Sequence, residues 1–149
     1  MSTPATPGQA TSAPPAGRLW LIPTPLQQPD ESRPWLLEAD RQQVATLTDF
    51  LVETPKVARR WLGQLGMQHP IQALNLRALP QRPAAAPARL DPHDWLAPLL
   101  QGRDMGLLSD AGCPGVADPG AALIAAAHRM NLPVMPLVGP SSLLLGLMA

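Results

Sequence analysis

The sequence predicts an α/β fold, with a five-stranded, mostly parallel sheet and helices on both of its faces. Short apolar runs that end in proline, glycine or polar loops alternate with longer segments whose apolar residues recur at helical spacing. Strands that alternate with helices in this way are typical of a parallel sheet covered by helices. The length of 149 residues allows one domain.

Five short apolar runs have the character of strands. The first is stopped by the turn Pro23-Thr24-Pro25, and the last is followed by Gly139-Pro140. The third run is the weakest of the five. The expected strands cover 19–22, 49–53, 71–76, 105–109 and 134–138.

Four longer segments between these runs predict helices. Pro55 opens the second helix and Gly66 ends it, in agreement with the preference for proline at the start and glycine just past the end. Asp118 is expected to be the N-cap of the last of the four, with Pro119 at its first position. The expected helices cover 35–47, 55–65, 91–102 and 119–130.

Three segments are unlike the rest of the chain. Residues 1–17, rich in Pro, Ala, Ser and Thr and without the features of a secretory signal, predict a disordered tail. Residues 80–88 predict a Pro/Ala linker or surface loop. Prolines interrupt the apolar run 132–149, which favours a buried strand followed by a buried helix start over a membrane helix. We therefore expect one ordered domain, 18–149, and no membrane partner.

Composition excludes several classes of function. Eleven basic and eleven acidic residues give a formal net charge of zero, without the footprint of a strongly basic nucleic-acid-binding domain. Cys113 is the only cysteine, which excludes an internal disulfide and a multi-cysteine metal site. The three histidines lack metal-ligand spacing, so no metal is expected. These features fit a cytoplasmic protein.

The loops after the strands are the expected place for chemistry, because open parallel sheets bind ligands beyond the carboxyl ends of their strands. The loop 109–120 is the most informative, since three glycines within nine positions let backbone approach a ligand closely. A tight strand-to-helix connection, in which Asp118 only caps the helix, is the alternative. The loop matches neither the phosphate-cradling Gly-Lys-Ser/Thr motif nor the Gly-x-Gly-x-x-Gly fingerprint.

Two motifs resemble a known family. The stretches GLLSDAGCPGVADPGAALIAAAH, 106–128, and PVMPLVGPSS, 133–142, resemble the tetrapyrrole methylase superfamily, in the branch of the small-subunit ribosomal RNA cytidine 2′-O-methyltransferases. Residues 21–25, LIPTP, are similar to the first strand and Thr-Pro loop of that branch. The segment 52–65, VETPKVARRWLGQL, is more similar to a shorter, less characterised subgroup. The resemblance covers 18–149.

The resemblance implies an S-adenosylmethionine-dependent methyltransferase that acts on ribosomal RNA or the small ribosomal subunit, as a homodimer. It also implies that the chain is the N-terminal, cofactor-binding domain, that the C-terminal domain is absent from it, and that it has little activity alone. The residues that would line the cofactor side of the cleft are Thr24, Pro25, Ser109, Asp110, Ala111, Gly112, Asp118, Gly139, Pro140, Ser141 and Ser142.

Glu53 is the candidate general base for a hydroxyl nucleophile, since it follows the second expected strand. An ion pair with Lys56 or Arg59 is an equally open interpretation of this carboxylate. Arg59 and Arg60, with Lys56 and Arg33, form either an RNA-facing patch or a solvated helix face.

A different class of function stays open. The chain ends at Ala149 inside an apparent helix without a capping signal. A non-catalytic fragment or degenerate relative, acting as a dimerisation or ligand-binding module, is therefore the alternative. Because the C-terminal domain is expected to be absent from the chain, the apolar residues 143–145 are expected to be exposed and to promote association.

Overall fold

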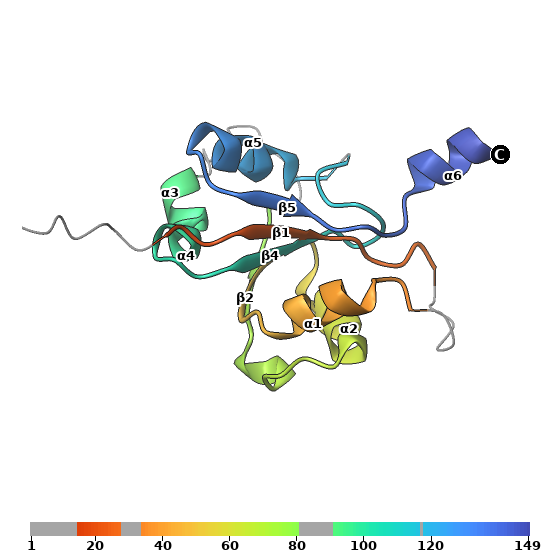
Figure 1. The fold of residues 1–149 in the computed structure, drawn as a ribbon, viewed down its shortest axis with the longest axis horizontal. Helices are drawn as coiled ribbons and strands as arrows, with labels where there is room; N and C mark the ends of the chain where they lie inside the picture. Colours follow the sequence, from red (N-terminus) through yellow and green to blue (C-terminus); the bar gives the residue numbers. More distant parts are fainter. Residues whose placement is uncertain (1–14, 28–33, 81–90, 117) are drawn as a thin grey trace, which may run out of the picture.

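The computed structural model describes residues 15–27, 34–80, 91–116 and 118–149. Its centre is one five-stranded sheet in the order β3-β2-β4-β1-β5, with every neighbouring pair parallel (Figure 1). The predicted fold class is therefore confirmed. Positions 1–14 of the expected tail and 81–88 of the expected linker lie outside the described residues. The strands are β1 (Leu19–Ile22), β2 (Asp49–Val52), β3 (Asn75–Ala78), β4 (Met105–Leu108) and β5 (Val134–Pro136).

Helices cover both faces of the sheet (Figure 1). One face carries α1 (Glu38–Ala45) and α2 (Pro55–Leu65), and the other carries α3 (Pro92–Trp95), α4 (Ala97–Leu100) and α5 (Ala121–Arg129). The short 3-10 helix η1 (Ile71–Ala73) precedes β3. A final helix, α6 (Ser142–Met148), extends away from the carboxyl edge of the sheet. No helix in the described part of the chain has the length and apolar character that a membrane span requires.

Two apolar cores lie on opposite faces of the sheet, because successive strand residues point to opposite sides. Phe50 and Val52 of β2 pack in one core with Leu62 of α2, and Leu51 packs in the other with Leu123 of α5. All four residues of β2 and of β4 are buried, as near-continuous apolar strands covered on both faces should be.

Two predicted elements are corrected by the structure. The third strand begins at Asn75 rather than at residue 71, because Asn75 pairs with Asp49 in register and donates from Nδ2 to Asp49 Oδ1 at 3.0 Å. The helix expected over 91–102 is two short helices that meet at Leu96. Pro98 has no N–H to continue the helix toward the carbonyl of Asp94, and Arg77 donates to that oxygen instead at 3.1 Å.

The last part of the chain also differs from the prediction. The strand and helix start expected to be buried are β5, which is half-buried to exposed at the edge of the sheet, and α6, which has no buried residue. The edge strand has only β1 as a neighbour, so half of its surroundings are open. Leu143, Leu144 and Leu145 are 59%, 61% and 56% exposed, as predicted for a chain without the C-terminal domain.

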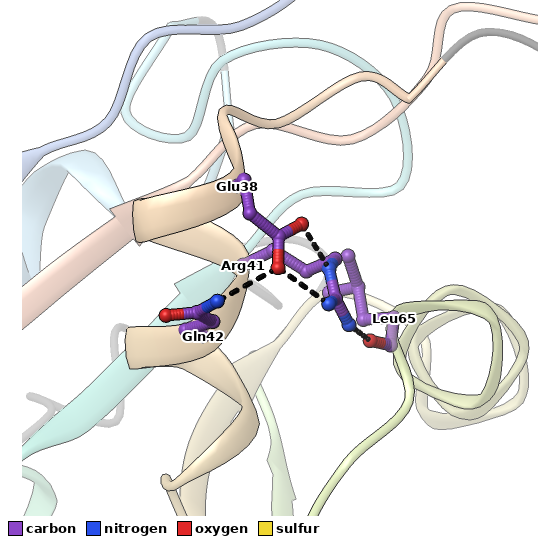
Figure 2. Close-up of polar contacts among 4 residues, drawn as sticks. All are labelled: Glu38, Arg41, Gln42 and Leu65. Carbon is purple, nitrogen blue, oxygen red and sulfur yellow. Dashed lines mark hydrogen bonds and ion pairs between the residues drawn. The ribbon is translucent and has the colours of Figure 1, made fainter.

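One exposed polar network joins α1 to the end of α2 (Figure 2). Glu38 accepts from Arg41 Nε at 2.8 Å and Nη2 at 2.7 Å, and from Gln42 Nε2 at 2.8 Å. Arg41 also donates to the backbone oxygen of Leu65 at 2.9 Å. The hydrogen bond from Arg41, and to a smaller extent the one from Gln42, lowers the pKa of Glu38 from 4.5 to about 2. Gly66, with φ of 73°, then ends α2 as predicted.

Candidate functional site

The loops after β1 and β4 are joined by a two-residue antiparallel bridge at the carboxyl edge of the sheet. Thr24 N donates to Gly112 O at 2.9 Å, and Gly112 N donates back to Thr24 O at 3.0 Å. The Thr24 hydroxyl, 1% exposed, donates to Ser109 O at 3.1 Å, and Ser109 Oγ donates to Gly112 O at 3.2 Å. Two predicted cofactor residues, Thr24 and Ser109, thus have buried side chains that hold the bridge.

Gly112 is required by the geometry of this bridge. Its φ of 79° lies in the left-handed region, and a Cβ there would stand 3.2 Å from Leu26 Cδ2. Pro25, another predicted cofactor residue, is buried directly after Thr24. Ala111, beside Gly112, is exposed at the edge.

The loop after β2 is tied to the loop after β4 through two carboxylates. Asp110 Oδ1 accepts from Thr54 N at 3.0 Å, and Asp110 Oδ2 accepts from the Thr54 hydroxyl at 2.6 Å. In return, Glu53 Oε2 accepts from Asp110 N at 3.0 Å. All three residues are half-buried. The predicted base Glu53 and the predicted cofactor ligand Asp110 therefore belong to one cluster, while an ion pair of Lys56 or Arg59 is not found within the described part of the chain.

Thr54 was not among the predicted site residues, although it links Asp110 to α2. It is the N-cap residue of that helix, and its place directly before Pro55 is a sequence signal for a helix start. Its partner lies 56 residues away, so no local pattern could indicate the contact.

Trp61 of α2 contacts the same cluster. Its side chain is 6% exposed, and Nε1 donates to Asp110 O at 3.5 Å. The Trp35 ring meets the Trp61 ring edge to face, with centroids 5.9 Å apart. The buried Trp35 Nε1 has no hydrogen-bond partner within the described residues.

The loop after β5 completes the edge. The Cys113 thiol donates to Pro140 O at 3.2 Å, and Gly139 lies so close to Pro23 that a Cβ would come within 2.5 Å of the Pro23 ring. Ser141 is the N-cap of α6, accepting from Leu144 N at 3.4 Å, and Ser142 begins that helix. The four loops therefore meet at one edge, as the parallel topology predicts.

Asp118 is the predicted cofactor residue that the structure keeps apart from this cluster, and its expected role as N-cap is wrong. Gly120 is the N-cap residue of α5, which begins at Ala121 rather than at Pro119. The Asp118 carboxylate instead accepts from Gly115 N at 2.5 Å and from Gly120 N at 2.6 Å. Two backbone N–H groups of its own loop therefore hold this carboxylate.

An open, mostly apolar groove of about 730 Å³ borders this edge. One wall is the segment that enters α1, and the other is the β5–α6 loop together with one side of α6. Sequence reasoning found the loop but missed the wall before α1, for which no motif gives a signal. The groove is lined by Pro34, Trp35, Leu36, Leu37, Glu38, Val138, Gly139, Pro140, Ser141, Leu144, Leu145 and Met148.

The donor set at the edge fits a small polar ligand. The backbone N–H groups of Ala111, Gly139 and Ser141 donate to no other described residue, and these residues are half-buried or exposed. Backbone donors of this kind bind carboxylates and heterocyclic nitrogens, and the half-buried Asp110 carboxylate offers acceptors for a cationic group. Within the described ranges, no three or more His, Cys, Asp or Glu side chains are grouped to hold a metal ion.

An open parallel sheet whose carboxyl edge joins four loops around a glycine-rich turn is an α/β architecture, in which ligands commonly bind beyond the carboxyl ends of the strands. No protein-family model matches the chain. Curated proteins named "Ribosomal RNA small subunit methyltransferase I" are similar to it. The relative from Xylella fastidiosa is 28% identical over 134 residues, which are 88% of this chain and 43% of the relative. The relative from Pseudomonas aeruginosa is also 28% identical over 134 residues, 90% of this chain and 43% of its own length.

A third relative of the same name, from Leptospira biflexa, is 33% identical over 93 residues, 62% of this chain and 35% of the relative. The chain spans less than half of the length of these relatives. The similarities confirm the resemblance to the small-subunit ribosomal RNA methyltransferase branch of the tetrapyrrole methylases that the two motifs predicted.

Proposed function

We propose that this chain is the cofactor-binding part of an S-adenosylmethionine-dependent methyltransferase that acts on a ribose 2′-hydroxyl of ribosomal RNA in the cytoplasm. The observation that supports it best is the joined carboxyl edge, where the loop segment 110–113 contacts the loops after β1, β2 and β5. The names of the similar proteins supply the substrate class and the reaction class.

S-adenosylmethionine supplies, when bound, a methyl group on a positively charged sulfur. The half-buried edge would hold it through the backbone N–H groups of Ala111, Gly139 and Ser141, which suit a carboxylate or an adenine. Each Asp110 oxygen accepts one hydrogen bond from Thr54 and retains capacity for another, from a ligand ammonium group. Because methyl transfer needs in-line placement of the reactants, fixing these loops contributes much of the catalysis.

Glu53 is the proposed general base. Its Oε2 accepts from Asp110 N, so the carboxylate is held at the rim of the same edge. A carboxylate within hydrogen-bond reach of a ribose hydroxyl can accept the proton that the hydroxyl loses on attack. Its position beside Asp110 is the support for assigning it this role.

Calorimetric titration of the complete gene product with S-adenosylmethionine tests the proposal. Measurable binding is expected, with the affinity of D110A lower by about 10- to 100-fold, since hydrogen bonds to charged groups contribute about 1.5–3 kcal/mol. D110N tests the charge, because an amide can still accept from Thr54 N while offering less to an ammonium group. D40N, which changes an α1 carboxylate outside the cluster, is the matched control and should bind like wild type. Absence of binding heat from the wild-type protein contradicts the proposal.

A non-catalytic dimerisation module is the second candidate, favoured by the exposed leucines of α6. Light scattering on the same samples gives the mass, and a homodimer is compatible with both candidates. Incorporation of labelled methyl groups into small-subunit ribosomal RNA separates them, because only the enzyme transfers methyl groups.

A further inference from the structure

One face of α2 carries three exposed cations. Lys56, Arg59 and Arg60 are spaced by three and four positions, so their side chains are neighbours on one side of the helix. The helix, PKVARRWLGQL, contains no acidic residue. We call these three residues the α2 basic face. Although the chain has no net charge, this cluster makes a local positive surface.

Among the described residues, three other arginines have carboxylate partners, whereas these cations have none. Arg41 pairs with Glu38 at 2.7 Å, Arg77 pairs with Asp94 at 2.5 Å, and Arg103 pairs with Asp49. Across the described part of the chain, no ion pair engages Lys56, Arg59 or Arg60. Eight basic residues are described, and three of the five without an ion pair belong to this single helix face.

The α2 basic face has a fixed position relative to the Glu53–Asp110 cluster. The Arg60 guanidinium lies over the Trp61 ring, 4.9 Å from its centroid, and Trp61 donates to Asp110 O. Asp110 in turn accepts twice from Thr54, the N-cap of α2. At 1.5 Å per residue, Arg60 is only about 9 Å along the helix axis from Thr54. The three cations therefore lie on the first turns of α2, which directly follows the proposed base Glu53 and the N-cap residue Thr54.

We propose that the α2 basic face contacts consecutive phosphates of the RNA strand whose ribose lies at the carboxyl edge. This inference rests on the proposed function. Three cations spread over more than one helical turn exceed what one phosphate needs, so they fit a polyanion rather than a mononucleotide. Arginine suits phosphate because its planar guanidinium can donate two parallel hydrogen bonds, and the Arg60 guanidinium lies over the Trp61 ring.

The test is RNA binding by the triple variant K56Q/R59Q/R60Q. Fluorescence anisotropy of the complete gene product with a labelled single-stranded oligouridylate is measured over a series of salt concentrations. The plot of the logarithm of the association constant against the logarithm of the salt concentration has a negative slope. Loss of three phosphate contacts should make this slope shallower by about 2 and weaken binding at low salt by at least about tenfold. The double variant R18Q/R129Q, which removes two other exposed arginines without ion pairs among the described residues, is the matched control and should change neither quantity.

Each outcome decides the matter. Unchanged affinity and salt slope in the triple variant, an equal loss in the control variant, or polyglutamate binding as tight as oligouridylate binding would overturn the inference. Melting curves of the variants test whether they are folded. We expect that they are, because all three side chains are exposed. Calorimetry with S-adenosylmethionine is a separate readout. If the wild-type protein binds RNA but not S-adenosylmethionine, the proposed function is refuted, while the α2 basic face is still supported as an RNA-binding surface.

Discussion

The two edges of the sheet use their carboxylates differently. At the amino edge, Asp49 is 3% exposed and accepts from Asn75 Nδ2 at 3.0 Å, from Thr48 Oγ1 at 3.1 Å and from Arg103. Asp104 there accepts from the backbone N of Arg18 at 2.8 Å and from Trp20 Nε1 at 3.0 Å. Three side chains therefore satisfy the buried Asp49.

At the carboxyl edge, Glu53 and Asp110 stay half-buried and accept chiefly from the loops. Their bonds join segments that are distant in sequence, and each Asp110 oxygen retains capacity for one more hydrogen bond. The amino edge therefore satisfies its carboxylates within the fold, while the carboxyl edge uses its carboxylates to order the loops around the proposed ligand site. Substitutions at the first edge should lower stability alone, and substitutions at the second should change both stability and ligand affinity.

The largest loss of stability is expected from D49A at the amino edge. Removing the carboxylate deletes three side-chain hydrogen bonds, one of them from a cation, and leaves their donors without this acceptor. The free energy of unfolding should fall by about 2–3 kcal/mol, measured by urea denaturation. Arg103 is half exposed and can turn to solvent, so the loss is smaller than for a fully buried pair.

Affinity for S-adenosylmethionine in D49A should stay within about twofold of wild type, because no ligand-binding group is removed. Loss of a ligand contact that contributes about 1.4 kcal/mol would lower the affinity about tenfold, which is well outside this twofold range. A large loss of affinity in a folded D49A protein would contradict the separation between the two edges.

G112A should have the next largest effect, at the carboxyl edge. An L-residue at its φ of 79° costs about 1–2 kcal/mol, and the new Cβ presses on Leu26. The bridge to Thr24 should loosen, so cofactor affinity and stability should fall together in calorimetry and urea denaturation. G63A is the matched control: nothing lies within 4 Å of its Cβ in α2, so it should stabilise the protein by about 0.5–1 kcal/mol.

Equal effects of G112A and G63A would show that glycine at 112 has no special role. A stability loss in G112A with full cofactor affinity would instead separate the bridge from the binding site and weaken the comparison of the edges.

The strands and α2 could be predicted from the sequence because their signals are local. The expected strand 19–22 is β1, the expected strand 105–109 contains β4, and Pro55 and Gly66 mark the two ends of α2 correctly. The topology then placed the four loops at one edge without any knowledge of contacts. Motif resemblance supplied the reaction class, which periodicity cannot.

The errors arise where a distant partner decides the local structure. The third strand starts late because Asn75 bonds to Asp49, 26 residues earlier, and the helix at 92–100 divides where Arg77 takes the carbonyl that Pro98 cannot bond. Asp118 is an exception, because its partners Gly115 N and Gly120 N lie in its own loop and hold the carboxylate there instead of at the start of α5. Asp49 and Asp104 were not singled out at all, since Arg103 and Trp20 lie 54 and 84 residues from them.

The smallest effect is expected from E38Q, which lies at neither edge and measures what an exposed contact contributes (Figure 2). The folded-state pKa of Glu38 is lowered from 4.5 to about 2, so its charge stabilises the fold above pH 4.5 and this contribution is lost as the pH falls toward 2. Wild type should therefore have a slightly higher Tm than E38Q near neutral pH, with the difference shrinking through that window. Salt should also shrink the difference, because the pair is exposed. D40N, on the same helix, removes a carboxylate without a hydrogen bond among the described residues and should show a smaller pH-dependent difference. A Tm difference for E38Q that stays constant from pH 7 to 2 would mean that packing of the side chain, rather than its charge, joins α1 to α2.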